Sequence, residues 1–361
     1  MYNMKNSLKE YILNLHAKRI KKGRVKYWRD LFTKRNSKLQ NKDTKLLPQE
    51  LDIIQKFYSK YNLTINPVFH QFYKYCKGTI SPEYIPDDLY YTYIDPFFND
   101  WVLAKYLDNK TFYHQLFPTI PQPKTVVYRQ NLYWFNSDQE IITEEIAIKT
   151  ILRYHECFLK QATDSEGGKN IYVITSKDSI QKVNAILKKI SGDIIVQEGL
   201  KQSSILSKLN SSSVNTLRLL TLLRLDGSVK LCSTSLRMGI NGAKVDNASS
   251  GGITVGVQKD GTLNSYAYSA DGIRYDSHPT SNVKFNSVII PNFSEVVEIV
   301  KREAKKHPHF RLISWDIALD QDNQPVLIEA NLKYGELEFH QLNNGPIFGD
   351  DTKTILDEVF L

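Results

Sequence analysis

Two carboxylates and an amide in the C-terminal part of the sequence have residue types that suit a metal ion. Asp316 stands in one apolar run, Glu329 stands in the next, and Asn331 follows two residues later. Side-chain oxygens of this kind are preferred by Mg²⁺ and Mn²⁺, and protein-bound Mg²⁺ usually also takes oxygens from substrate phosphates. The pattern therefore indicates a metal site for a nucleotide phosphate. The alternative is a pair of acids neutralised by Lys or Arg.

The two apolar runs around these residues predict a β-hairpin. Residues 313–319 and 325–330 are rich in Ile, Leu, Val and Trp, and the polar run 320–324 separates them. A turn centred between residues 322 and 323 places Asp316 opposite Glu329, with Cβ atoms about 5 Å apart. Because side chains alternate along a strand, Glu329 and Asn331 share a face. We expect the three to converge unless a β-bulge shifts the register.

Cations that could bind the phosphates stand elsewhere in the chain. Lys160 ends a predicted strand and precedes a loop with Gly167 and Gly168, whose backbone N–H groups could fold over phosphates. Arg218 lies on one predicted strand and Arg237 ends the strand paired with it. Each residue alone is better explained as a hairpin or surface residue. Together with the acidic hairpin they supply the cations that a triphosphate needs.

The remaining elements predict an α+β protein. Strands are expected at 125–130 and 193–200, and a strand–loop–strand unit at 155–174. A helix at 176–192, which Ser179 can cap, is expected between this unit and the strand at 193–200. Two hairpins with Asp-Gly turns follow, at 216–239 and 251–269, and then a helix at 293–307. This order differs from alternating βαβ units, and the sequence has no Rossmann or Walker A motif.

The N-terminal third predicts mainly helices and loops. Residues 46–105 carry aromatic residues throughout. The proline-containing stretch 81–101 is expected to be a connection with short turns. A single helix is expected at 103–117, before a proline break and the first strand.

Composition favours a globular protein of a reducing compartment. The chain has 361 residues, 41% of them hydrophobic, which allows two or three subdomains. No apolar run approaches the roughly 20 residues of a membrane span, and we see no signal peptide. Cys76, Cys157 and Cys232 form no CxxC pair and are expected to be core thiols. We therefore expect a cytoplasmic location.

The net charge of +8 is concentrated at the N-terminus. Residues 1–45 contain 14 Lys or Arg and three acids, which gives +11 there and −3 over the remaining chain. A basic helical segment suits an anionic membrane surface or a nucleic acid, and a solvated helix face is the alternative. No motif favours nucleic acid. We expect deletion of residues 1–45 to weaken binding to anionic vesicles.

A series of motifs occurs in a fixed order along the chain: LDNKTFYHQLFPTIPQP, FLKQATDSEGGK, VQEGL, NTLR, LRMG, DNASSGG and WDIALD followed by VLIEAN. Taken in this order, the motifs resemble the ATP-grasp superfamily, and most closely the sugar-transfer-associated ATP-grasp proteins of bacterial surface-polysaccharide gene clusters. The resemblance covers roughly residues 100–345. One departure is Gln161 after Lys160, where the family has proline.

The resemblance implies an ATP-grasp fold, in which two α+β subdomains clamp ATP, with Mg²⁺ (or Mn²⁺) on the phosphates. It implies an N-terminal subdomain with a phosphate flap at 96–200 and a C-terminal subdomain with the metal site at 201–361. Residues 1–95, which the resemblance does not cover, are expected to form a helical basic region. The implied roles are phosphate binding by Lys110 and Lys160, a flap containing Ser165, Gly167 and Gly168, an adenine and ribose pocket of Gln197, Glu198 and Leu200, phosphate contacts by Arg218 and Arg237, and metal binding by Asp316, Glu329 and Asn331. Lys160 and Arg237 would act in catalysis, with Arg237 facing the transferred phosphate.

The implied activity is an ATP-dependent carboxylate–amine ligase that works through an acylphosphate. Its substrates would be a small-molecule carboxylate and an amine or sugar, in a glycan precursor of surface-polysaccharide biosynthesis. Two alternatives stay open, a phosphotransferase acting on a hydroxyl and a nucleotide-binding protein without activity. The acceptor would lie near residues 332–345, where Lys333, His340 and Gln341 are candidates for substrate contact or for packing. The basic N-terminus would place the protein at the inner face of the membrane.

Overall fold

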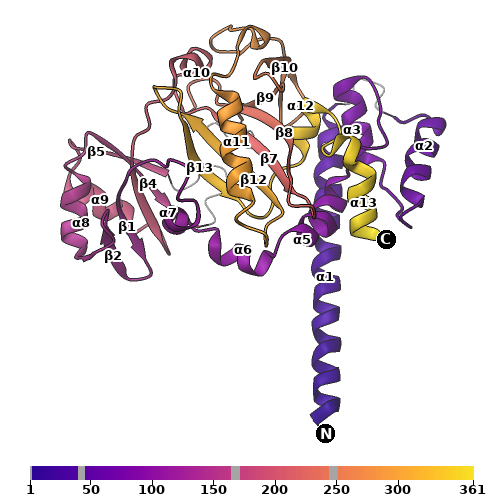
Figure 1. The fold of residues 1–361 in the computed structure, drawn as a ribbon, viewed down its shortest axis with the longest axis horizontal. Coiled ribbons are helices and arrows are strands. Elements are labelled where there is room, and N and C mark those ends of the chain that lie inside the picture. Colours follow the sequence, from indigo (N-terminus) through magenta and orange to yellow (C-terminus); the bar gives the residue numbers. More distant parts are fainter. Residues whose placement is uncertain (1, 40–44, 164–170, 244–250) are drawn as a thin grey trace.

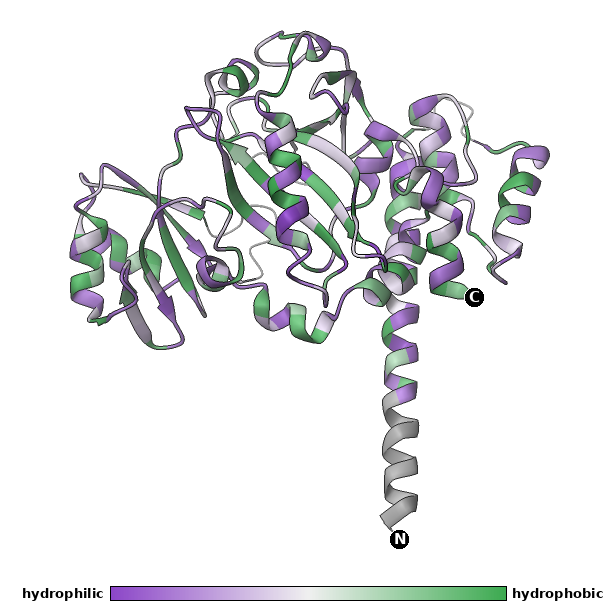
Figure 2. Ribbon diagram, in the orientation of Figure 1, coloured by the Kyte–Doolittle hydropathy of each residue, from purple (hydrophilic) through white to green (hydrophobic). Residues whose placement is uncertain are grey.

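In the computed structural model the chain forms a helical N-terminal region, a small lobe with a six-stranded sheet and a large lobe with a seven-stranded sheet (Figure 1). The structure describes residues 2–39, 45–163, 171–243 and 251–361, with only the backbone of residues 2–13. Within these ranges no helix is both long and apolar enough to cross a membrane. The strands of the two sheets are predominantly hydrophobic, and polar residues follow the outward faces of the helices (Figure 2).

The small lobe is an antiparallel sheet covered by two helices. The strand order is β3-β2-β1-β6-β4-β5. Apolar residues of both helices pack on the sheet in one core. Ser179 caps the second helix as expected, because its Oγ accepts a hydrogen bond from the Lys182 N–H at 3.2 Å. The bounds are β1 (Thr125–Gln130), β2 (Tyr133–Asn136), β3 (Ile141–Ile142), α8 (Glu144–Ile151), β4 (Glu156–Gln161), β5 (Ile171–Thr175), α9 (Ile180–Leu187) and β6 (Ile194–Glu198).

The strands expected in this lobe are confirmed, but the hairpin of β1 and β2, the short strand β3 and helix α8 were not predicted from the sequence. The predicted helix at 176–192 is confirmed over a shorter span.

The large lobe is also antiparallel, with strand order β11-β10-β9-β8-β7-β12-β13. All of the hairpins expected from the sequence are present, and so is the predicted helix near 293–307. Its bounds are α10 (Ser204–Leu209), β7 (Thr216–Leu223), β8 (Val229–Met238), β9 (Ile253–Val257), β10 (Leu263–Ser269), β11 (Arg274–Tyr275), η5 (Phe285–Ser287), α11 (Phe293–Ala304), β12 (Leu312–Leu319) and β13 (Pro325–Asn331).

The two faces of the large sheet have different partners, as β7 shows. Leu217 and Leu219 point into the core that α11 covers. Leu220 and Leu222 belong to the opposite core, which the N-terminal helices cover. Arg218 lies on that second face as well, at the end of β7 where polar residues replace the apolar contacts with the helices. Strand alternation thus places Arg218, Leu220 and Leu222 on the same face, which is apolar at Leu220 and Leu222 and charged at Arg218.

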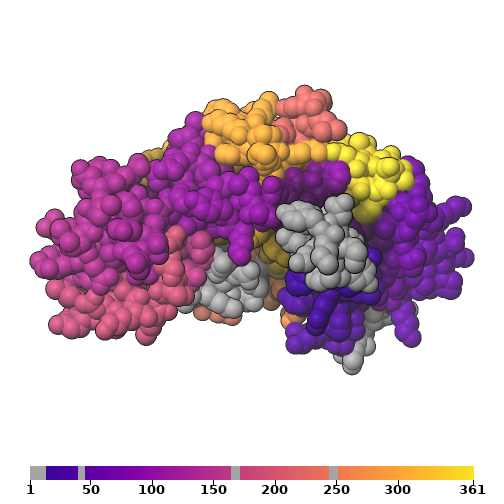
Figure 3. Space-filling model, turned by 90° about the horizontal axis from the view of Figure 1, so that it is seen from below, coloured from indigo at the N-terminus to yellow at the C-terminus, as the bar shows by residue number. Residues whose placement is uncertain are grey.

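The N-terminal region packs against the C-terminal helices. Lys60 of α2 forms an ion pair with Asp357 of α13 at 2.7 Å, and Figure 3 shows α13 (yellow) beside the N-terminal helices. The bounds are α1 (Tyr2–Ser37), α2 (Pro48–Ser59), α3 (Val68–Lys77), α4 (Asp87–Leu89), the π-helical turn η1 (Tyr90–Ile94), α5 (Asp95–Phe98), α6 (Trp101–Leu107), η2 (Lys110–Phe112), α7 (Tyr113–Leu116), α12 (Glu338–Asn344), η6 (Gly349–Asp351) and α13 (Thr352–Phe360).

Two sequence predictions for this region are wrong. The helix expected at 103–117 is broken, because Asn109 turns its side chain back to accept a hydrogen bond from the Thr111 N–H at 3.0 Å and starts a new turn. The stretch 81–101, expected to be a connection, is helical from Asp87 to Phe98. Pro86 directly precedes the first helical residue, where a missing N–H costs nothing, and Pro96 is the second residue of the short helix α5.

Helix α1 has an exposed half and a packed half. Residues 14–23 are all exposed, and this half projects away from the body (Figure 1). Beyond it, Phe32 is fully buried and Arg35 nearly so. The basic segment is therefore only partly a free surface, and deletion of residues 1–45 would remove core side chains.

Candidate functional site

A row of charged side chains crosses four neighbouring strands of the large sheet. Arg218 on β7 is directly opposite Asp316 on β12, and Asp316 is directly opposite Glu329 on β13. Arg237 on β8 pairs with Thr216, which lies two residues from Arg218 on the same face of β7. The predicted pairing of Asp316 with Glu329 is confirmed.

The local geometry that produces this pairing differs from the prediction. Near the turn, Ile317 pairs with Leu327, so the turn is centred on Asp322 and not after it. A β-bulge between this pair and the Asp316–Glu329 pair adds one residue to β13 and restores the expected register. The bulge also lets Leu327 enter the α11 core while Glu329 faces the opposite side. Without it, the carboxylate of residue 329 would not meet that of residue 316.

Asp316 is buried and held by both arginines. Its carboxylate accepts two hydrogen bonds from Arg218, from Nε at 2.7 Å and from NH2 at 2.6 Å, and one from Arg237 NH1 at 3.0 Å. Burial alone raises the pKa of Asp316, but the charges of the two arginines outweigh it and lower the pKa below its ordinary value. Asp316 is therefore ionised at neutral pH and fixes both guanidinium groups.

The two lobes meet at Glu329. The Lys110 ammonium, from the segment leading into the small lobe, lies 2.5 Å from Glu329 Oε1. The Lys110 N–H donates to the Ala162 carbonyl at 3.0 Å. This contact ties Lys110 to the end of β4, two residues beyond Lys160.

Lys160 has a lowered pKa. Burial, together with the positive charge of Lys110, lowers the pKa of Lys160 to about 8, although Glu329 acts in the opposite direction. The residue is half-buried, and its ammonium donates to Gln197 Oε1 at 3.2 Å. The structure thus brings Lys110, Lys160 and Glu329 together, as predicted.

The predicted adenine and ribose residues lie at the end of β6, with different surroundings. Gln197 is buried and also donates to the Pro123 carbonyl at 3.4 Å. The Glu198 side chain is 47% exposed, 3.9 Å from the Lys124 ammonium, and Leu200 is half-buried. The predicted flap residues Ser165, Gly167 and Gly168 lie outside the described residues.

The predicted metal ligands Asp316 and Glu329 are both in ion pairs, Asp316 with Arg218 and Arg237 and Glu329 with Lys110. Among the described residues no group of three or more His, Cys, Asp or Glu could hold a metal ion, so a Mg²⁺ site here would have two carboxylates and one amide as its protein ligands. Asn331 is half-buried and its amide nitrogen donates to the Ser314 carbonyl at 3.3 Å, which leaves the oxygen as its ligand atom. Mg²⁺ commonly takes few protein oxygens and completes its shell with phosphate and water. A polyphosphate would also match the excess of cations.

Sequence reasoning missed Glu336, which belongs to this charge cluster. Its Oε2 accepts a hydrogen bond from Arg218 NH1 at 2.6 Å. Counting it, four cations face three carboxylates (Lys110, Lys160, Arg218 and Arg237 against Asp316, Glu329 and Glu336). A glutamate in a loop gives no local sign of a partner 118 residues away, so no sequence pattern could have found it.

The acceptor candidates have different surroundings. His340 is buried beside the charge cluster, and burial lowers its pKa to about 4. Its Nδ1 lies 2.9 Å from Ser233 Oγ, and its Nε2 has no hydrogen-bond partner among the described residues. Gln341 instead bridges the helices, donating to the Tyr73 hydroxyl and the Ile85 carbonyl at 2.9 Å each. Gln341 is thus a packing residue, and Lys333 is half-buried in the loop after β13.

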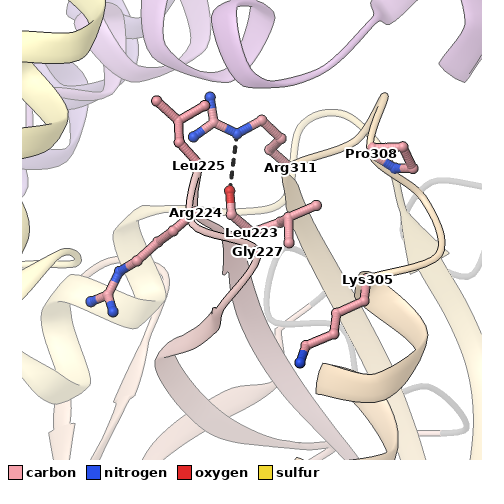
Figure 4. A pocket seen from close by; sticks show the side chains of 7 residues that line it. All are labelled: Leu223, Arg224, Leu225, Gly227, Lys305, Pro308 and Arg311. Carbon is pink, nitrogen blue, oxygen red and sulfur yellow. Dashed lines mark hydrogen bonds between the residues drawn. The ribbon is translucent and has the colours of Figure 1, made fainter.

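A surface hollow of about 330 Å³ lies elsewhere, at the β7–β8 turn (Figure 4). Arg311 donates to the Leu223 carbonyl at 2.9 Å across its floor. At roughly 3.3 Å per residue, Leu223 lies about 17 Å along β7 from Arg218. The basic residues Arg224 and Arg311 are paired with Asp351 and Glu358. The hollow is therefore separate from the charge cluster.

Solved structures with a similar fold include several ligases. The ATP-grasp ligase PsnB, in complex with a minimal precursor, is 14% identical with a TM-score of 0.40, covering 72% of this chain and 64% of that one. D-alanyl-alanine synthetase A from Vibrio cholerae is 13% identical with a TM-score of 0.38, covering 70% and 65%. VanG D-Ala:D-Ser ligase from Enterococcus faecalis is 14% identical with a TM-score of 0.38, covering 70% and 60%. The chain thus matches less than two thirds of each of these proteins.

Comparison with curated protein sequences found no match. The family model described as "Sugar-transfer associated ATP-grasp" matches residues 91–355, which include both sheets and the whole charge cluster. The chain therefore belongs to the sugar-transfer-associated ATP-grasp family.

Proposed function

We propose that this protein is an ATP-dependent ligase that joins a carboxylate to an amine, one of them carried by a sugar or a glycan precursor. The observation that carries the proposal is the convergence of four cations, from both lobes, on the carboxylates of one β-hairpin. A site with more cations than anions suits an anionic polyphosphate, and the flanking oxygens suit its metal ion.

Each group has a role in phosphoryl transfer. Lys110 and Lys160 would bind phosphate oxygens from the small-lobe side, and Arg218 and Arg237 from the large sheet. Asp316 fixes both guanidinium groups, so that they need not reorganise as charge develops on the transferred phosphoryl group. A bound Mg²⁺ would be held by Asp316, Glu329 and Asn331 and would neutralise phosphate charge.

The proposed reaction has two steps. An oxygen of the substrate carboxylate attacks the γ-phosphorus of ATP, which forms an acylphosphate and releases ADP. The amine then attacks the acyl carbon, phosphate leaves, and the amine loses a proton as the amide forms. The protein's part in both steps is positioning and electrostatic stabilisation.

The location that we propose is cytoplasmic, with the exposed half of α1 in reversible contact with an anionic membrane surface. This proposal is supported by the exposed side chains of Lys18, Arg19, Lys21 and Lys22 among the exposed apolar residues Leu15 and Ile20.

The test is ADP release by the Glu329→Gln variant. The substitution removes a charge but little volume, so we expect a folded protein that has lost almost all turnover. Glu298→Gln makes the same chemical change on the exposed surface of α11, and we expect that control to match the unmodified protein. Normal turnover in folded Glu329→Gln would refute the site. Product analysis separates the chemistries, since a ligase yields ADP, phosphate and an amide, whereas a phosphotransferase yields ADP and a phosphoester.

A further inference from the structure

The loop 332–337, directly after β13, has a strained backbone. Tyr334 and Glu336 have φ values of 55° and 60°, in the left-handed region that side chains other than glycine rarely adopt. Gly335 between them has no room for a side chain, because a Cβ there would lie 2.9 Å from the Ser314 Cβ. Strained conformations persist only where surrounding contacts hold them, and they concentrate at functional sites.

This loop sets the position of one arginine of the site. Glu336 Oε2 accepts a hydrogen bond from Arg218 NH1 at 2.6 Å, while the other two nitrogens of Arg218 bind Asp316. The Arg218 guanidinium is therefore held on one side by the sheet and on the other by the loop. Any shift of the loop would move or release it.

Two residues of the segment 87–98 hold the loop in place. Asp95 Oδ2 accepts a hydrogen bond from the Tyr334 N–H at 2.8 Å. The Tyr91 hydroxyl accepts one from the Leu337 N–H at 2.9 Å. Both Tyr91 and Asp95 are buried, so water cannot replace them as partners. The loop conformation thus depends on the position of this helical segment.

Helix α1 in turn holds that segment. The Trp28 ring stacks on the Tyr91 ring, with centroids 4.1 Å apart and an angle of 10° between the planes. Arg24 NH1 donates to the Tyr91 carbonyl at 3.2 Å, and its guanidinium lies 4.4 Å above the Trp101 ring. The Trp101 ring is 4.5 Å from that of Tyr334. These contacts form a continuous path from α1 to both ends of the strained loop.

We propose that α1, which precedes the residues matched by the family model, positions residues of the site. Arg24 and Trp28 are positioning residues that fix the loop 332–337. Through Glu336 of that loop they also fix the Arg218 guanidinium. Helix α1 could instead serve only to cover the core, as Phe32 does. The two accounts differ in whether a change at Tyr91 reaches Arg218. The expected effect on nucleotide affinity rests on the proposed function, whereas the expected effect on the loop conformation does not.

The structural consequence is tested with Tyr91→Phe, which removes one hydroxyl and keeps the ring against Trp28. Amide hydrogen exchange, followed residue by residue, should become at least about 10-fold faster at Leu337, because a buried N–H loses its partner. Tyr93→Phe removes the same atom from a half-exposed ring two residues away, and it should leave Leu337 unchanged. Unchanged exchange at Leu337 and Tyr334 in Tyr91→Phe would overturn the proposal.

The connection to Arg218 is tested by a double-mutant cycle with Glu336→Gln. The probe is a non-hydrolysable ATP analogue with Mg²⁺, and the measurement is its affinity by calorimetry. Tyr91→Phe should weaken binding about threefold or more, because an arginine that must first be ordered binds less well. In the Glu336→Gln background the same change should have no further effect. Additive effects of the two substitutions would show that Tyr91 does not act through Glu336.

The role of α1 itself is tested with Arg24→Met and Trp28→Leu. Both should speed exchange at Tyr334 and Leu337, whereas Arg19→Met, at an exposed position of the same helix, should not. Exchange at wild-type rates in folded Arg24→Met and Trp28→Leu would limit α1 to packing and refute the proposal. If the unmodified protein binds no nucleotide, the proposed function fails, while the exchange measurements still decide whether α1 holds the loop.

Discussion

With Lys160 beside the nucleotide phosphates, as proposed, its lowered pKa predicts a nucleotide affinity that depends on pH in a defined window. The pKa falls from an ordinary 10.5 to about 8 because the ammonium is desolvated and faces Lys110. A bound polyphosphate places negative charge beside the same ammonium and so raises the pKa again. The bound state therefore holds more protons than the free state above pH 8, and affinity must fall as the pH rises through that value.

The size of the effect follows from these two pKa values. If only the charged lysine binds well, about nine tenths of the free protein is competent at pH 7 and about one tenth at pH 9, so affinity falls roughly 10-fold between them. If binding restores the ordinary value, the full difference of about 2.5 units is worth about 3 kcal/mol. Binding at pH 9 should then take up close to one proton, and at pH 7 only about a tenth of one.

Calorimetry with a non-hydrolysable ATP analogue and Mg²⁺ measures both quantities, because proton uptake appears as a dependence of the heat on the buffer's ionisation enthalpy. Lys160→Arg keeps the charge at all these pH values, so its affinity should lose the dependence on pH. Lys160→Met should bind at pH 7 about as weakly as the unmodified protein does at high pH. Equal affinity at pH 7 and 9 without proton uptake, or an unchanged pH dependence in Lys160→Arg, would refute the reasoning.

Three further predictions concern stability and surface binding. Asp316→Asn should destabilise the fold by about 3–5 kcal/mol in urea unfolding, because it leaves two buried guanidinium groups without their counter-charge; a change below 1 kcal/mol would contradict this. Trp315→Ala should lower the free energy of unfolding in urea by about 3–5 kcal/mol, because Trp315 is a fully buried side chain of the large core. A chain that begins at residue 24 should fold, but it should sediment less with anionic vesicles than the full chain, since each lost Lys or Arg contributes up to about 1 kcal/mol near the surface at low salt. Equal sedimentation of the two chains, or none by either, would make the exposed half of α1 a solvated helix.

Much of the fold could be predicted because its signals are local. Apolar runs on either side of an Asp-Gly turn predicted β7 and β8 as a hairpin, and Gly227 adopts the positive φ that the turn requires. Ser179 predicted the start of α9 for the same reason, since a cap lies within three residues of the N–H that it satisfies. The wrong prediction for residues 81–101 also came from a local signal. The prolines in 81–101 predict a connection, although Pro86 directly precedes a helix and Pro96 lies within one.

The site itself was determined partly by sequence and partly by tertiary structure. The sequence by itself predicted which residues could bind a metal ion and phosphates, and it placed Asp316 and Glu329 on the two strands of one hairpin. Only the tertiary structure decided that a bulge restores this register, that Lys110 crosses from the other lobe to Glu329, and that Glu336 and α1 take part. The physical reason is one of range. Side-chain alternation and capping depend on neighbouring residues, whereas an ion pair between residues 110 and 329 requires that the whole chain between them has folded.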